Sequence, residues 1–132
     1  MKFRNSVFAA AALAATILGS AASAAPGLTG EQRLAKELAG RVPGEPVSCI
    51  YLPQVRSTKI IDKTAIIYDA GQTIYVNRPA DPQWLDSHDV LVTRPHGPEL
   101  CSVDIVRLYD SGMMGPRGSI GLGQFVPYRK AS

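Results

Sequence analysis

The sequence predicts a mainly β protein, folded as one small barrel-like or sandwich-like domain of five to seven strands with one short N-terminal helix. Short apolar segments recur from residue 47 onward and are separated by glycine, proline and other turn residues. Several segments are apolar on both faces, as at Ile60-Ile61, which is typical of strands buried on two sides. The chain shows no alternation of strands with long helices, so a parallel α/β sheet is not expected.

Residues 1–24 have the three parts of a cleavable secretory signal peptide. Lys2 and Arg4 form a basic start, an apolar run covers residues 6–18, and a series of small residues follows. This pattern predicts that the protein is exported, either to the periplasm or out of the cell.

The end of that segment has the small residues that a signal peptidase prefers, and we expect cleavage between Ala24 and Ala25. The alternative is an uncleaved anchor. However, the apolar run is shorter than the roughly 20 residues that a transmembrane helix needs. We therefore expect no integral membrane anchor.

The formal net charge of +3 depends largely on this segment. Without it, residues 25–132 carry 12 basic and 11 acidic side chains, a net charge of +1. The basic residues are scattered along the sequence, whereas nucleic-acid binding needs a clustered basic face. Nucleic acid is therefore not expected as a partner.

Cys49 and Cys101 are the two cysteines of the chain. Export would place them in an oxidising compartment, where disulfides persist. One intramolecular bond between them would close a loop of roughly 50 residues and contribute about 4 kcal/mol to stability. A free or intermolecular thiol is the alternative.

Residues 25–46 are expected to form a linker and the short helix. Thr29 and Gln32 have the spacing of a capping box, and Gly40 is a suitable stop, so we predict a helix over residues 30–39. Two prolines then indicate a spacer.

The β-rich domain is expected to occupy residues 47–132. A glycine at position 71 favours a hairpin turn between two of its strands. The expected strands are 47–52, 55–61, 64–69, 72–77, 89–93, 100–109 and 122–126. The intervening loops 77–88 and 110–121 are the expected contact surfaces.

Known catalytic patterns fit this sequence poorly. The glycine-rich stretch 115–123 lacks the helix and the Lys-Ser/Thr pair of a phosphate loop, so we expect it to lead into the last strand as turns. Ser87 precedes His88, but neighbours in an extended chain point apart, and no nucleophile elbow is present.

His88 and His96 are the only histidines. With Asp86 and Asp89 they could be imagined as a metal site, but their spacing matches no recognisable ligand pattern. We expect histidines in surface loops, and no metal or other cofactor.

Asp62, Asp104 and Trp84 are the candidate binding-loop residues. Each aspartate lies within an apolar stretch and could act as one of a catalytic pair. A structural role is the expectation, either on the solvent face of an edge strand or as a buried acceptor for backbone N–H groups. Trp84 with Tyr68 and Tyr75 could form a stacking patch for sugar or peptide, although core packing is the commoner role of aromatic side chains. No catalytic residue is assigned.

Five short motifs follow one another along residues 48–128. They are Cys49-Ile50, Ile60-Ile61-Asp62, Asn77-Arg78, Leu100-Cys101 with Asp104, and Gly121-Leu122-Gly123 with Phe125. In order and spacing this part of the chain resembles a family of small exported bacterial proteins with a domain of unknown function.

Members of that family usually carry two further cysteines, which this chain lacks together. The resemblance therefore implies that Cys49 bonds with Cys101. It also implies an exported, globular, non-catalytic domain, and it supplies no substrate or catalytic residue.

The expected function is a non-enzymatic binding or interaction module that meets an envelope protein or a cell-wall component. One alternative is a structural or stress-related envelope protein. The other is a small secreted enzyme that uses Asp62 or Asp104.

Overall fold

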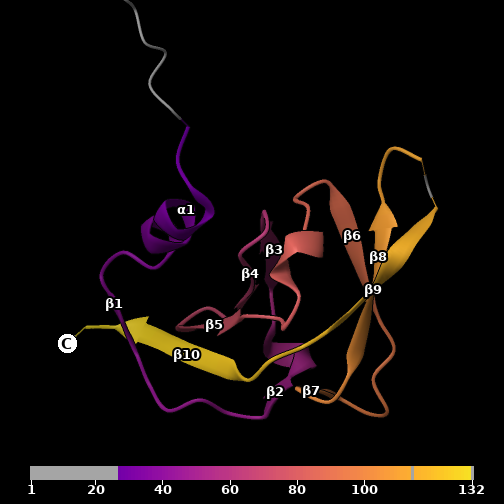
Figure 1. Ribbon diagram of the computed structural model, residues 1–132. Helices are drawn as coiled ribbons and strands as arrows, with labels where there is room; N and C mark the ends of the chain where they lie inside the picture. Colours follow the sequence, from indigo (N-terminus) through magenta and orange to yellow (C-terminus); the bar gives the residue numbers. More distant parts are fainter. Residues whose placement is uncertain (1–26, 114, 132) are drawn as a thin grey trace, which may run out of the picture.

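The computed structural model describes residues 27–113 and 115–131 (Figure 1). Within them, one α-helix precedes ten short strands in three antiparallel sheets, which confirms the predicted mainly β class with its short helix. The strands exceed the expected five to seven, because one expected strand divides in two and two further segments pair as strands. The expected signal peptide, with its cleavage point between Ala24 and Ala25, lies outside the described residues.

Helix α1 (Gly30–Glu37) begins at the predicted capping box. The Thr29 hydroxyl accepts the N–H of Gln32, and the Gln32 side chain accepts the N–H of Thr29. Gly40, with a φ of +76°, follows the end of the helix. In the described ranges, no helix has the length and apolar character needed to cross a membrane.

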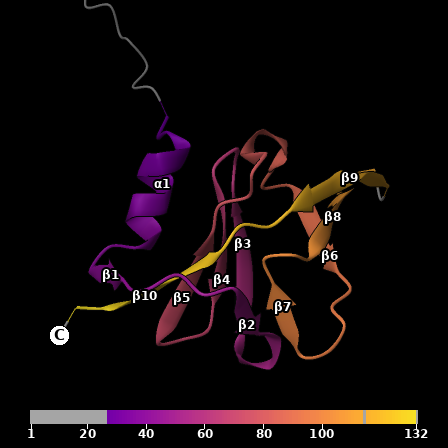
Figure 2. The same ribbon diagram turned by 60° about the horizontal axis from the view of Figure 1, so that its bottom comes forward.

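The largest sheet has five strands in the order β1-β10-β5-β4-β3, and α1 packs on one of its faces (Figure 2). Gly71 makes the predicted turn between β4 and β5 with a φ of +86°. The strands are β1 (Arg41–Pro43), β3 (Ser57–Ile61), β4 (Ala65–Asp69), β5 (Thr73–Asn77) and β10 (Phe125–Lys130).

The prediction of a spacer after the helix is partly wrong, because strand β1 lies within that segment and pairs with β10. Pro43 is tolerated there because β1 is an edge strand, where one side of the backbone has no strand partner.

The remaining strands form a pair, β2 (Cys49–Tyr51) with β7 (Glu99–Cys101), and a three-stranded sheet in the order β6-β8-β9. Figure 1 shows the three-stranded sheet well apart from α1. Its strands are β6 (Asp89–Thr93), β8 (Ile105–Asp110) and β9 (Pro116–Gly121). Two single-turn 3₁₀ helices, η1 (Leu52–Gln54) and η2 (Pro82–Trp84), complete the fold.

Two predicted segments are corrected. The expected strand 100–109 is broken at residues 102–104, where a turn separates β7 from β8. The stretch 115–123, expected as turns, contains β9, because its backbone pairs with β8 despite its glycine content.

The five-stranded sheet is buried on both faces, as the paired isoleucines predict. Ile60 and Ile66 face the core shared with the two smaller sheets. Ile61 and Ile67 face α1 and contact a second cluster that includes Leu34. The alternation along each strand therefore builds a layered molecule: helix, large sheet, small sheets.

Candidate binding groove between two sheet edges

The disulfide is formed as expected. Cys49 and Cys101 lie directly opposite each other in β2 and β7, with sulfur atoms 2.08 Å apart. The neighbouring pair, Ile50 and Leu100, is buried in the main core. The bond therefore links the two strands of this sheet covalently. Glu99 lies nearby, but both cysteines are in the disulfide, so no free thiolate is present to bind a metal with it.

Asp62 follows β3 and is bound to two other segments. Its carboxylate accepts the N–H of Ser87, and its second oxygen lies 3.3 Å from the Ser87 hydroxyl. The Arg33 guanidinium of α1 donates to the same oxygen at 3.4 Å. These contacts are structural, since they join the β3–β4 turn to the segment before β6 and to the helix.

Asp104 has a different set of contacts. Its carboxylate accepts the N–H of Cys101 at 2.7 Å, and its own N–H donates to the Cys101 carbonyl at 2.9 Å. The residue thus closes the turn between β7 and β8. Among the described residues, Asp62 and Asp104 share no hydrogen-bond partner. Both have structural roles as acceptors for backbone N–H groups, but both are partly exposed rather than buried.

The three aromatic side chains do not form one patch. Tyr68 is 3% exposed and packs edge-to-face against Phe125, with ring centroids 5.7 Å apart. Tyr75 is half-buried beside the same core. Trp84 is 57% exposed and lines a separate hollow next to Arg117. The prediction of core packing is therefore confirmed for Tyr68 and wrong for Trp84.

The acidic residues on either side of His88 have different partners. His88 Nδ1 lies 3.0 Å from Asp86, and the N–H of His88 is the main cause that lowers the pKa of that carboxyl. Asp89, by contrast, is bound by Arg117 in two places, at 2.9 and 2.6 Å. The expected loop position of His88 is confirmed, and Asp89 faces a guanidinium rather than the histidines.

The Asp89–Arg117 pair fixes one end of β6. The Asp89 side chain is 1% exposed, and Arg117 also donates to the carbonyl of Trp84 at 2.8 Å. Hydrogen bonding to Asp89 raises the pKa of Arg117 above its usual value. One guanidinium therefore joins β9, the start of β6 and η2.

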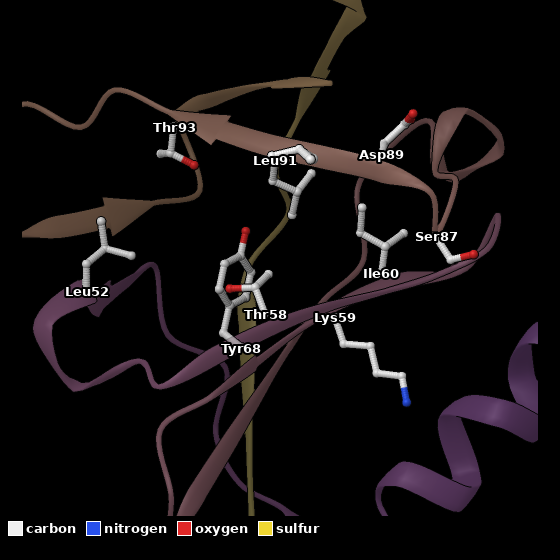
Figure 3. Close-up of a pocket in the computed structure, with 10 residues that line it drawn as sticks. Leu52, Thr58, Lys59, Ile60, Tyr68, Ser87, Asp89, Leu91 and Thr93 are labelled. Atoms are coloured by element: carbon white, nitrogen blue, oxygen red, sulfur yellow. The ribbon is translucent and has the colours of Figure 1, made fainter. Parts of the chain in front are cut away.

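A groove of about 530 Å³ lies beside β6 and extends to β3 (Figure 3). Each of these strands ends its own sheet, so within residues 27–113 and 115–131 β3 pairs only with β4, and β6 pairs only with β8. Figure 3 shows the side chain of Leu91 between them. The groove is lined by Leu52, Thr58, Lys59, Ile60, Tyr68, Ser87, Asp89, Val90, Leu91 and Thr93.

The Tyr68 hydroxyl is the most unusual polar group of this groove. Its oxygen is buried and has no hydrogen-bond partner among the described residues. Figure 3 shows it directed towards the strand that carries Leu91. Burial without a partner raises the pKa of Tyr68, because the ionised form would be poorly solvated.

Helix α1 holds β3 from the opposite side of the sheet. Glu37 forms an ion pair with Lys59, which lies in the middle of β3. Glu31 and Arg78 form a second pair with a 2.7 Å contact, and the hydrogen bond from Arg78 lowers the pKa of Glu31. The helix therefore supports the β3 wall of the groove from the other face of the sheet.

Sequence reasoning did not find this groove. The expected contact loops contribute only Ser87 to its lining, and of the three candidate binding-loop residues none lines it. Thr58 and Leu91 are 33 positions apart, so no local motif joins them. The paired edges arise from the order of strands in the two sheets, which periodicity along one strand does not encode.

No family model matches the chain, and neither the curated proteins nor the solved structures that we searched gave a significant match.

Proposed function

We propose that this chain is a non-enzymatic, exported binding module whose groove holds an extended segment of an envelope protein as an added strand. The observation that carries the proposal is that two sheet edges, β3 and β6, border one groove. Alternate residues of an edge strand direct their N–H and C=O groups away from the paired neighbour. An extended peptide can hydrogen-bond to such groups, as in other cases of strand addition.

The lining of the groove favours the same occupant. Leu52, Ile60 and Leu91 offer apolar contacts for alternate side chains of a bound strand.

Three observations support export. The sequence predicts a signal peptide over residues 1–24, and the Cys49–Cys101 disulfide is compatible with an oxidising compartment. The resemblance to small exported bacterial proteins points the same way. An envelope protein fits the groove better than a cell-wall glycan, because unpaired backbone groups match a polypeptide.

The two alternatives gain no specific support. An enzyme using Asp62 or Asp104 lacks a reacting pair, because both carboxylates are committed to backbone N–H groups in different turns. A structural or stress-related role would need no ligand, and no contact of the groove points to it specifically.

A peptide selection tests the proposal. The disulfide-bonded protein would be presented with a displayed library of random ten-residue peptides, and enriched peptides would be measured by fluorescence anisotropy. We expect affinity to fall at least about tenfold in Thr58→Arg, since a long cation would fill the groove at an exposed position. Ile105→Arg, at an exposed position of β8 outside the groove, is the matched control and should bind normally.

Hydrogen exchange on the complex gives a second readout. Peptide binding should slow amide exchange in β3 and β6 together, because both edges would become paired. The proposal fails if no peptide is enriched, or if the enriched peptides bind Thr58→Arg and the unaltered protein equally well.

A further inference from the structure

A basic cluster surrounds the turn between β4 and β5, away from the groove. It consists of Arg41, Arg56, Arg129 and Lys130, which come from β1, the residue before β3, and the end of β10. Strand pairing brings these residues to the same end of the sheet: Arg41 lies opposite Lys130, and Arg129 lies opposite Thr73. Figure 1 shows β1 beside the tip of β10, close to the marked C-terminus.

Arg41 binds the same turn from strand β1. Its guanidinium donates to the carbonyls of Gln72 at 2.9 Å, Tyr128 at 3.2 Å and Gly71 at 3.4 Å. Carbonyl groups fix its position but do not neutralise its charge. Arg41 therefore leaves a positive charge at the turn.

Arg56 lies directly against the same turn. A Cβ atom at Gly71 would approach the Arg56 Cζ to 3.1 Å, so the glycine allows the guanidinium to rest there. Arg129 donates from Nε to the Thr73 hydroxyl at 3.2 Å, which orients its side chain. With Lys130 they line a polar concavity of about 680 Å³.

The cluster has few anionic neighbours. Among the described residues, Arg33, Lys59, Arg78 and Arg117 each lie within salt-bridge distance of a carboxylate, but no member of the cluster does. The nearest acidic residue in the turn is Asp69, whose carboxylate accepts the N–H of Gly71 at 2.7 Å. Three cations therefore line this concavity and Arg41 binds the same turn, and in the described part of the chain none of the four forms an ion pair with a carboxylate.

We propose that this concavity binds a phosphate group. Guanidinium groups present planar donor pairs that match phosphate oxygens, and a lysine adds a mobile point charge. Arg56 and Arg129 would donate to the phosphate oxygens, and Lys130 would add a third contact to the same oxygens. Arg41 would contribute its charge from strand β1. The phosphate could belong to a soluble anion or to a membrane headgroup.

Titration with inorganic pyrophosphate tests this site on the disulfide-bonded protein. NMR shifts of the amides of residues 71–73 should saturate, with a dissociation constant of about 1 mM or lower at low salt. The double variant Arg56→Ala/Arg129→Ala should weaken binding at least about tenfold, because each guanidinium loses charge-assisted hydrogen bonds.

Arg94→Ala/Arg107→Ala is the matched control, since it removes the same charge from exposed positions of the chain outside the cluster. This control should bind pyrophosphate with less than about a twofold loss. An equal loss in both double variants, or shifts spread over the whole surface, would overturn the proposal, because screening by net charge alone would then explain binding.

Vesicles distinguish the two sources of phosphate. Binding to phosphatidylglycerol vesicles that pyrophosphate displaces, with none to phosphatidylcholine vesicles, would identify an anionic headgroup. Pyrophosphate binding without vesicle binding would identify a soluble anion. The site does not overlap the groove, so its failure would leave the peptide proposal standing.

Discussion

Asn77 and Gly123 show how two residues 46 positions apart depend on each other. The Asn77 side chain is fully buried, donates to the Gly123 carbonyl at 2.7 Å and accepts its N–H at 2.9 Å. A Cβ atom at position 123 would lie 2.4 Å from the carbonyl oxygen of Arg78. This contact gives a physical reason for asparagine in one motif and glycine in the other.

Gly123→Ala should therefore destabilise the protein by about 3 kcal/mol, because backbone must shift to make room. Chemical denaturation would measure the change. Gly121→Ala is the matched control: a Cβ there meets nothing within 4 Å, so its effect should stay within about 0.5 kcal/mol. Equal effects of the two substitutions would contradict the close approach.

The burial of Tyr68 should make the stability of the folded protein depend on pH. Burial raises its pKa, so above about pH 10 the unfolded chain releases the phenolic proton while the folded chain retains it. The stability of the unaltered protein relative to Tyr68→Phe should then fall by about 1 kcal/mol per pH unit.

Near neutral pH, Tyr68→Phe should be neutral or stabilising, since the hydroxyl has no partner to lose. Urea unfolding at a series of pH values measures both effects, with Tyr51→Phe, at an exposed tyrosine, as the control. A clear loss of stability at neutral pH would mean that the hydroxyl is hydrogen-bonded.

At the scale of elements, the turn between β7 and β8 depends on one carboxylate. The apolar residues of 100–109 favour a continuous strand, but Asp104 binds the N–H of Cys101 and folds the chain back. Val103 is consequently exposed at the turn, and Ile105 lies on the outer side of β8. A local side-chain contact thus overrides the apolar pattern.

Asp104→Ala should cost about 1–2 kcal/mol, because the Cys101 N–H loses its acceptor. Asp104→Asn keeps an oxygen at the same place and should recover most of the stability. Thermal unfolding followed by circular dichroism compares them. If the two variants are equally destabilised, the charge rather than the hydrogen bond supports the turn.

At the scale of the whole molecule, the disulfide restricts the unfolded chain. Its two cysteines are 52 positions apart, and a loop of this length contributes about 4 kcal/mol in the chain-entropy description. Cys49→Ser/Cys101→Ser should therefore lower the free energy of unfolding by about this amount.

Denaturant titration of the double variant checks the disulfide prediction, with the reduced unaltered protein as the comparison. Both should be destabilised to a similar extent, since both lack the same covalent link. A double variant as stable as the oxidised protein would show that the bond does not form.

Four features could be predicted from the amino-acid sequence: the β class, the capped helix, the hairpin at Gly71 and the cysteine pairing. These features depend on local rules: capping geometry, turn chemistry, the alternation of apolar residues, and the single pairing open to two cysteines. A structural role was also expected for Asp62 and Asp104, and both accept backbone N–H groups, although at partly exposed positions rather than in the core.

The groove and the basic cluster could not be predicted in this way, because they depend on the folded arrangement of the strands. The strand orders β1-β10-β5-β4-β3 and β6-β8-β9 determine which strands end their sheets. They also place two such edges beside one groove and bring four scattered cations to one turn. Strand order is set by long-range pairing and by the fit of the layers, and these are properties of the packed chain that no single segment carries.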